Sequence, residues 1–266
     1  MWRMDIRALA DELLSAHETQ RELSPPSRRD PHFRLEDGYA VGALVHEHRV
    51  ESGWTPVGFK LGFTNQAIWG QLGLSSPFCS HVYAQTVHDV SDQNEIPLSR
   101  YVAPRIEPEI VVGLGSDVAA DASADEVATA LAWAALGIEI VQCHYPNWEM
   151  KPADAIADAG LHAALLIGPR HQLDRDAANR LALAEVTLRR SGREVSRGPG
   201  SAALGGPVRA LVWLLSLPGI DALPSGTTVT TGTLTPAFPV VPGEVWQVNE
   251  TDPEGLGAIE IHLTRS

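Results

Sequence analysis

The stretch 104–115, PRIEPEIVVGLG, places two glutamates two positions apart inside an apolar run. Such a run is typical of a β-strand, in which alternate side chains share a face, so Glu107 and Glu109 are expected to point the same way. Carboxylates roughly 7 Å apart along a strand repel each other unless a cation neutralises them. The pattern has two interpretations: a metal-binding pair within a sheet, or the solvated face of an edge strand marked by Pro108.

A third acid, Glu139, lies in the run 137–141, GIEIV, between two isoleucines. Glu139 is also expected to lie within a β-strand. By itself, however, this run is equally typical of an ordinary amphipathic strand with a solvated face. Three carboxylates without a thiolate suit a hard divalent cation such as Mg²⁺ or Mn²⁺. The two cysteines, Cys79 and Cys143, are too few for a disulfide framework or a thiolate zinc site.

The bulk composition limits the possible partners. A chain of 266 residues is long enough for one large domain, or for one domain with a small appendage. Its formal net charge of −13 repels phosphate backbones, so nucleic acid is not an expected partner. No apolar run approaches the roughly 18 residues of a membrane span, and the N-terminus does not resemble a signal peptide. These features predict a cytoplasmic protein.

The pattern of apolar residues divides the chain into two parts. Apolar residues recur at helical spacing in 6–14 and again in 39–48, which predicts a helical N-terminal region over residues 1–54. Short apolar runs separated by Gly, Pro, Asn and Asp predict a β-rich catalytic domain over residues 55–266. Two helices are expected to interrupt it, one over 123–137 and one over 206–217. The predicted fold class is α+β, with a mixed or antiparallel β core.

Four segments together resemble a known family. They are 57–73 (VGFKLGFTNQAIWGQLG), 104–115, 135–160 (ALGIEIVQCHYPNWEMKPADAIADAG) and 230–244 (TTGTLTPAFPVVPGE). In order and spacing they are similar to the fumarylacetoacetate hydrolase superfamily, in the branch of 2-keto-4-pentenoate hydratases and 4-oxalocrotonate decarboxylases. The resemblance runs from about residue 40 to the end of the chain. It implies a mixed β-roll of the type found in the C-terminal domain of that family.

The resemblance also implies a metal centre. Its ligands are expected to be Glu107, Glu109 and Glu139, holding Mg²⁺ or Mn²⁺. In this family the metal chelates a 2-keto acid through its carboxylate and keto oxygens, and acts as a Lewis acid in hydration, decarboxylation or C–C cleavage.

Two lysines match the family's site. Lys60, between two apolar residues, is expected to be partly desolvated, with its pKa lowered into the range useful for proton transfer; the alternative is a lysine that extends to the surface. Lys151 and Asp154 match a lysine–aspartate loop, and Asp158 falls at a second family acid. The alternative for this loop is a solvated helix start.

The backbone of Leu61 and Gly62 is expected to bind the substrate carboxylate. The turn formed by Thr231, Gly232 and Thr233 matches a family turn near the substrate, and an ordinary threonine-rich strand end is the alternative.

The chain departs from the family at two places. An Asn and a Ser pair usually follow the second acid, but 159–162 reads AGLH, and Phe78 begins FCS where an Asp-Phe-Gly is usual. His81 and His162 lie at these departures and could supply acid–base chemistry near neutral pH, although a hydrogen-bonded structural role is the alternative. The other histidines suggest no ligand set and are interpreted as surface or packing residues.

The expected function is that of a divalent-metal-dependent hydratase acting on a small 2-keto-enoic acid. A 2-keto diacid decarboxylase is the close alternative. A C–C hydrolase or isomerase on the same fold and a non-catalytic paralogue that supports a partner enzyme also remain open. A homo-oligomer is expected, because members of the family are generally oligomeric.

Overall fold

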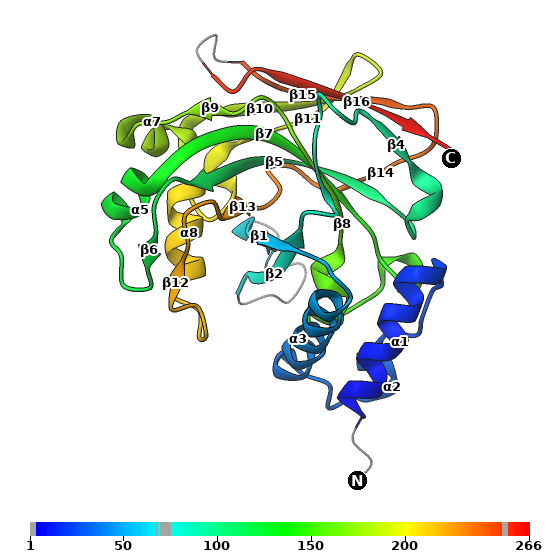
Figure 1. Cartoon of the computed structure of the whole chain (residues 1–266). Helices are drawn as coiled ribbons and strands as arrows, with labels where there is room; N and C mark the ends of the chain where they lie inside the picture. The colour runs from blue at the N-terminus through cyan, green and yellow to red at the C-terminus, as the bar shows by residue number, and fades with distance from the viewer. Residues whose placement is uncertain (1–3, 67–68, 70–75, 252–254) are drawn as a thin grey trace.

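The computed structural model of the chain describes residues 4–66, 69, 76–251 and 255–266. Its first part is helical, and α1 (Ile6–Thr19), α2 (Pro26–Arg29) and α3 (Leu35–Glu51) lie together at the lower right of Figure 1. Asp5 caps α1, because its carboxylate accepts hydrogen bonds from two backbone amides of the first turn. No helix in the described ranges is long and apolar enough to cross a membrane.

A large mixed sheet follows the helices, with the strand order β2-β1-β13-β5-β7-β8-β3; β14 adds beside β5, and β9 beside β7. In Figure 1, β5 and β7 form a long curved arch, and β1 and β2 lie beneath it. The strands are β1 (Pro56–Gly62), β2 (Phe78–Tyr83), β3 (Val87–Asp89), β5 (Arg105–Leu114), β7 (Leu131–Val141), β8 (His162–Ile167), β9 (His171–Gln172), β13 (Thr228–Thr230) and β14 (Phe238–Pro239).

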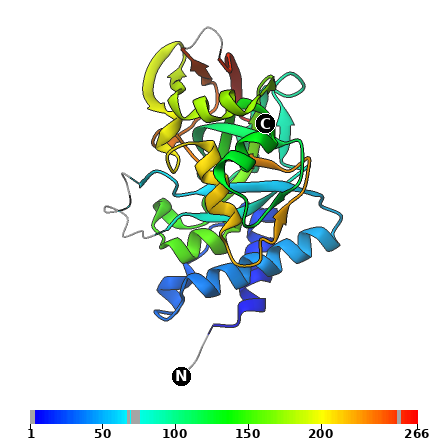
Figure 2. The same ribbon diagram turned by 90° about the vertical axis from the view of Figure 1, so that its left-hand side faces the viewer.

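A second sheet has the strand order β11-β10-β15-β16-β4. It lies above the arch in Figure 1, and its red and yellow-green strands are at the top of Figure 2. Trp246 and Ile261 of this sheet belong to the same buried cluster as Ile138 and Ile140 of β7, so the main core joins the two sheets. The remaining strands are β4 (Glu95–Pro97), β6 (Val118–Ala119), β10 (Glu185–Arg190), β11 (Arg193–Pro199), β12 (Ala222–Leu223), β15 (Val245–Glu250) and β16 (Ala258–Thr264).

Short helices complete the β-rich part. Among them, α5 and α8 contribute Val127, Leu211 and Leu214 to the main core. The helices are α5 (Ala124–Ala130), α6 (Pro152–Ala157), α7 (Arg175–Arg180) and α8 (Pro207–Leu215), with the 3₁₀ turns η2 (Leu98–Arg100), η3 (Pro146–Trp148), η4 (Ala159–Leu161), η5 (Leu181–Leu183) and η6 (Gly200–Ala202).

The N-terminal helices pack on the segment that follows β7. A second buried cluster joins Leu13 of α1 and Val41 of α3 to Cys143 and Ala157. Helix α3 approaches α6 closely, because a Cβ at Gly38 would lie only 2.5 Å from a backbone oxygen of α6. The proposed boundary between 1–54 and 55–266 falls between the end of α3 and the start of β1, and this division stays a prediction.

The α+β class and the helices expected over 6–14, 39–48 and 206–217 are confirmed. The helix expected over 123–137 is wrong in its second half, because α5 stops at Ala130 and β7 starts at Leu131. Its alanines favour a helix locally, but the segment pairs with β5 along almost its whole length, and this tertiary pairing outweighs local propensity.

Candidate functional site

Three glutamates meet where β5 and β7 pair. Glu107 lies directly opposite Glu139 in the antiparallel register, and Glu109 lies opposite Gly137. Each of the three glutamates offers a carboxylate oxygen, and these oxygens all lie within 4.8 Å of one another. Glu109 and Glu139 are fully buried, whereas Glu107 is partly exposed. The sheet register therefore brings together the three acids that the sequence singled out.

The alternative that these glutamates lie on a solvated edge strand is wrong. Strand β5 is internal, with β7 on one side and both β13 and β14 on the other. Pro108 is tolerated there because it falls between the residues of β5 that pair with β13 and those that pair with β14. At this gap its carbonyl accepts a hydrogen bond from the backbone of Leu234.

Lys60 reaches the same cluster from β1. Its Nζ lies 2.9 Å from Oε2 of Glu139, and only 3% of the side chain is exposed, so it is not a surface lysine. Burial alone would lower the pKa of Lys60, but the carboxylates of Glu139, Glu107 and Glu109 outweigh it and the pKa is raised. The expectation of a lowered pKa is therefore wrong, because it considered the apolar neighbours of Lys60 in the sequence and not three facing carboxylates.

The three carboxylates differ in their electrostatics. Burial, together with the other two glutamates, raises the pKa of Glu109 well above its ordinary value. Burial also raises the pKa of Glu107, to about 7, against the opposing effect of Lys60. For Glu139, burial is outweighed by Lys60 and by a hydrogen bond from His162, so its pKa is lowered. The raised pKa values of Glu107 and Glu109 reflect a repulsion that one lysine does not offset, and a further cation would relieve it.

One carboxylate oxygen of Glu109 is hydrogen-bonded and the other is not, within the described part of the chain. Its Oε2 accepts hydrogen bonds from the hydroxyl of Thr230 and, at 2.8 Å, from the backbone amide of Gly232. Its Oε1 is buried and has no hydrogen-bond partner among the residues that the structure describes. A buried carboxylate oxygen without a donor is costly, and an oxygen-preferring divalent cation would satisfy it. The donor set therefore fits Mg²⁺ or Mn²⁺.

The Thr231–Thr233 turn is expected near the substrate. In the structure the backbone amide of Gly232 in this turn donates a hydrogen bond to Glu109. Gly232 adopts φ +109°, and a Cβ there would lie 1.8 Å from Oγ1 of Thr64, so only glycine fits. Thr231 bonds to the carbonyl of Ile110, and the hydroxyl of Thr233 bonds within its own turn. Thr230, which the sequence did not single out, donates to Glu109; only its pairing with β5 could have revealed this.

His162 braces Glu139 from the far side. Its Nδ1 lies 2.7 Å from Oε1 of Glu139, and its Nε2 lies 2.9 Å from the hydroxyl of Thr86. Burial lowers the pKa of His162, although the hydrogen bond to Glu139 opposes this. Because both ring nitrogens are engaged, the ring is fixed in position, as in the carboxylate–histidine pairs that orient metal ligands.

The structure does not bring His81 to the glutamates. On the paired strands β1 and β2, Lys60 is opposite Ser80 and Phe59 is opposite His81, so His81 points to the opposite face of the sheet from Lys60. There its ring stacks on that of His46, with the centroids 3.7 Å apart. Burial, with a smaller contribution from His46, lowers the pKa of His81 to about 4. The contacts of His81 are thus ring contacts on the face away from Lys60, and its part in acid–base chemistry stays a prediction.

Lys151 and Asp154 occupy the start of α6. Lys151 is exposed and borders a cavity of about 440 Å³ that is also lined by Tyr39, Phe63 and Phe78. Asp154 is buried, and its carboxylate accepts hydrogen bonds from the amide and hydroxyl of Ser27 and from the amide of Lys151. These bonds of the Asp154 carboxylate tie α2 to α6, and they do not join it to the glutamates. The solvated helix start is wrong for Asp154, which is fully buried.

Leu61 and Gly62, expected to bind the substrate carboxylate, end β1 one and two residues after Lys60. Leu61 is buried, and Gly62 lies against the ring of Phe78, where a Cβ would come within 2.1 Å of it. Their carboxylate-binding role stays a prediction.

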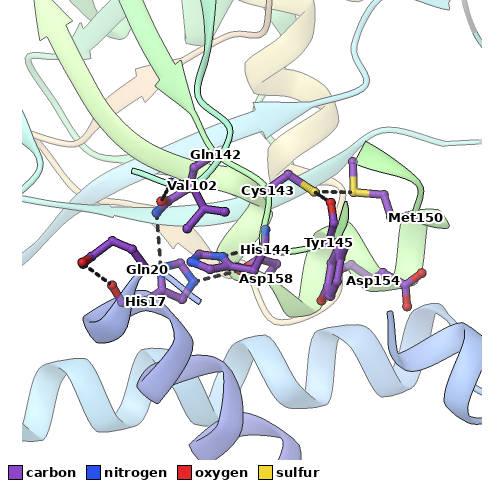
Figure 3. Close-up of polar contacts among 10 residues, drawn as sticks. All are labelled: His17, Gln20, Val102, Gln142, Cys143, His144, Tyr145, Met150, Asp154 and Asp158. Carbon is purple, nitrogen blue, oxygen red and sulfur yellow. Dashed lines mark hydrogen bonds and ion pairs between the residues drawn. The ribbon is translucent and has the colours of Figure 1, made fainter. Parts of the chain in front are cut away.

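A second cluster of titratable side chains is formed by His17, His144 and Asp158. The sequence did not suggest that these histidines belong together. Asp158 sits between His17 and His144 (Figure 3), with Nε2 of His17 at 2.9 Å and Nδ1 of His144 at 2.8 Å from its Oδ1. Burial opposes ionisation of Asp158, but hydrogen bonds from both histidines hold its pKa well below its ordinary value. These are hydrogen-bond distances, and the cluster ties α1 to the segment after β7.

Two successive hydrogen bonds determine which ring nitrogen of His17 carries the proton. The backbone amide of Val102 donates to Oε1 of Gln142, so the amide nitrogen of Gln142 faces Nδ1 of His17, at 3.3 Å. Nδ1 of His17 is therefore an acceptor, and its proton is on Nε2, facing Asp158 (Figure 3). No motif in the sequence links positions 17, 142 and 158, because their proximity arises from the packing of α1.

Comparison with known proteins places this geometry in a family. A family model described as fumarylacetoacetate (FAA) hydrolase C-terminal matches residues 72–264. A TodF product hydratase of Pseudomonas putida is 30% identical over 259 residues, which cover 96% of this chain and 93% of that protein. A 4-oxalocrotonate decarboxylase of a Pseudomonas species is 30% identical over 224 residues, which cover 83% of this chain and 84% of that protein.

A solved structure shares the whole fold. The 4-oxalocrotonate decarboxylase from Pseudomonas putida G7, complexed with magnesium and adipate, superposes with a TM-score of 0.89 at 24% identity and covers 99% of this chain and 98% of that one. With the mixed sheets, the β5–β7 carboxylates and the family model in agreement, this chain belongs to the fumarylacetoacetate hydrolase family.

Proposed function

We propose that this chain is a divalent-metal-dependent lyase that hydrates a small 2-keto-enoic acid. The observation that carries the proposal is the buried group formed by Glu107, Glu109, Glu139 and Lys60, in which Oε1 of Glu109 has no hydrogen-bond partner among the described residues. Relatives that are about 30% identical over nearly the full length are named hydratases, which supports this class of reaction.

Glu107, Glu109 and Glu139 would hold Mg²⁺ or Mn²⁺. A bound divalent ion supplies Lewis-acid polarisation of a 2-keto oxygen. The chain's own contribution is to orient the ligands: Thr230 and Gly232 fix Glu109, and His162 fixes Glu139. This outer layer of hydrogen bonds holds the carboxylates in place before any ion arrives.

Lys60 supplies positive charge and a proton. The carboxylates raise its pKa and keep the ammonium group charged at neutral pH. A cation held by the same carboxylates would offset their effect on Lys60, and we assign Nζ the role of a proton donor to the substrate carbon skeleton because of its place beside them. Arg105 precedes Glu107 by two residues on β5 and therefore shares its face, where it lies over the ring of Trp148. We assign Arg105 to the substrate carboxylate, together with the backbone of Leu61 and Gly62.

A decarboxylase is the second candidate. A relative named 4-oxalocrotonate decarboxylase is as similar in identity as the hydratases, and the chain lacks the family's usual Asn and Ser pair at 159–162. The two candidates predict different products. Hydration removes the conjugated absorbance of the substrate without releasing CO₂, whereas decarboxylation releases CO₂ in proportion to the substrate consumed.

The test is a panel of small 2-keto-enoic acids, with and without a second carboxylate, assayed with Mg²⁺ or Mn²⁺ for absorbance loss and CO₂. Glu107→Gln should abolish turnover, and the exposed Glu51→Gln should leave it unchanged. Loss of absorbance without CO₂ supports the hydratase. CO₂ release identifies the decarboxylase, and cleavage or isomer products identify the other enzymatic alternatives. No turnover of any member would favour a non-catalytic paralogue.

We also propose that the chain is a cytoplasmic homo-oligomer. The two free cysteines, Cys79 and Cys143, are consistent with a reducing compartment. Light scattering of the purified protein gives the number of subunits, and a monomer over the whole working concentration range would contradict the proposed oligomer.

A further inference from the structure

A second cavity lies on the other side of His162 from Glu139. Its volume is about 350 Å³, within the range of small-molecule sites. Its walls come from α1, α3, the β2–β3 connection, the end of η2 and the start of β8. His162 and Thr86, which bond to each other, form part of its wall. The cavity is therefore separate from the glutamate cluster but shares His162 with it.

The cavity is lined by cationic and hydrogen-bond-donating groups. Arg49 and Arg100 line it together with His17, His48 and His88, and among the described residues that line it Glu18 is the one acid. Burial lowers the pKa of His88, and the nearby Arg100 lowers it further; burial and, in smaller part, Arg49 lower the pKa of His17. Positive charge lining a cleft concentrates anions there.

Arg49 is the residue that most needs a ligand. It is 7% exposed, and its guanidinium lies over the rings of Trp54 and Tyr83 and hydrogen-bonds to the side chain of Tyr83, so both of these partners are neutral side chains. No ion pair formed within the described part of the chain includes Arg49. A buried arginine without a carboxylate partner is costly, because five N–H groups and a charge are removed from water.

Asp158 does not meet this need. Its charge favours ionised Arg49 through space, but its two oxygens already accept from the ring and the backbone amide of His144, and Nε2 of His17 lies 2.9 Å from its Oδ1. Arg49 lines the cavity with no carboxylate among its ion-pair partners in the described part of the chain. Carboxylates match the planar fork of an arginine in a bidentate manner, so they are the natural occupants.

We propose that this cavity is a second binding site, for a small organic anion with one or two carboxylates, held by Arg49 with Arg100 at the cavity edge. The site needs no divalent metal, so it is distinct from the proposed catalytic centre.

The test uses the full-length protein after chelation and dialysis, titrated by calorimetry with succinate, acetate and inorganic phosphate separately. We expect saturable binding of a carboxylate, with one site per chain. Arg49→Lys keeps the positive charge but loses the planar guanidinium that can bind a carboxylate in a bidentate manner. Arg100→Gln removes an exposed charge. Each should weaken binding by about tenfold, the effect of losing one charge-assisted hydrogen bond. Arg193→Gln, an exposed arginine far along the chain, is the matched control and should bind normally.

The outcomes separate this proposal from the proposed function. Glu107→Gln should bind the carboxylate with unchanged affinity even though it cannot turn over substrate. Binding of phosphate but of neither carboxylate would contradict the ligand class. Absence of binding by all three probes at about 10 mM, far above typical affinities for a small-ligand site, would overturn the site itself. So would carboxylate binding that is equal in wild type, Arg49→Lys and Arg100→Gln, provided that each variant melts as a folded protein.

Discussion

Glu107 and Glu139 lie directly opposite each other on the paired strands β5 and β7. Like charges at facing positions of a sheet repel, and here Glu109 adds a third carboxylate on the same face. The sheet tolerates this arrangement because Lys60 inserts from β1 and forms an ion pair with Glu139. Repulsion that is only partly offset makes the cluster the most informative target for experiments.

Removing one of these acids should remove the response to metal. We expect Mg²⁺ or Mn²⁺ to raise the melting temperature of the wild-type protein, because an ion that binds only the folded state stabilises it; at about a hundred times its dissociation constant the gain is about 2.7 kcal/mol. Glu107→Gln should show no such rise. Differential scanning fluorimetry with and without metal measures both, and Glu51→Gln serves as the control. A wild-type protein indifferent to both ions would contradict the proposed centre.

Lys60→Met should cost both stability and activity. It leaves Glu139 buried without its ion-pair partner, which destabilises a protein by about 3–5 kcal/mol before the carboxylates take up protons. Loss of the proposed proton donor should reduce kcat by about 10²- to 10⁴-fold. Urea denaturation and steady-state kinetics measure the two effects. Lys60→Arg keeps the charge and should recover stability more than activity; full activity in Lys60→Met would rule out a role in proton transfer.

Asp158→Asn should loosen the docking of α1 without touching the glutamates. The amide removes the negative charge that both histidine rings face, and it replaces Oδ2, which accepts from the backbone amide of His144, by an NH₂ donor. We expect a loss on the order of 2–4 kcal/mol in the free energy of unfolding. Hydrogen exchange should increase in α1 first. Asp176→Asn, at an exposed aspartate, should change neither quantity, and an unchanged exchange pattern in Asp158→Asn would show that the cluster does not hold the helix.

The stacked pair of His81 and His46 should make the fold sensitive to acid. Burial, with a contribution from His46, lowers the pKa of His81 to about 4, so between roughly pH 6.5 and pH 4 the unfolded chain binds a proton that the folded chain does not. Stability should therefore be constant above pH about 6.5 and fall below it, by on the order of 1–3 kcal/mol after allowance for partial exposure.

His81→Phe keeps an aromatic ring and cannot titrate, so its stability should fall less steeply over the same pH range. Urea midpoints between about pH 7 and pH 4 test this. The exposed His262→Gln is the control. A slope as steep in His81→Phe as in the wild type would assign the acid sensitivity to other groups.

The sequence predicted the parts of the site that depend on local spacing. The i, i+2 spacing put Glu107 and Glu109 on one face, and Glu139 stood out as an acid within an apolar strand. It could not reveal that β5 is internal, because Pro108 is tolerated at a gap between two neighbouring strands, and neither strand is close to it in sequence.

Properties that depend on distant neighbours were missed or wrongly predicted. The pKa of Lys60 is set by carboxylates on β5 and β7, and its apolar neighbours on β1 suggested the opposite shift. The segment 131–137 is rich in helix-forming alanine, yet it becomes a strand because β5 offers a partner for it. His17 meets Asp158 only because α1 packs where it does.

Lys60 has one more consequence. Its ammonium group serves as an internal counter-ion for the acidic cluster, so the protein does not depend on an incoming metal in order to reach its folded state. An ion could then leave and return while the surrounding sheet stays intact. The availability of magnesium or manganese in the cell would then set how many copies are active at a given moment, while the metal-free copies keep the same fold at a lower stability.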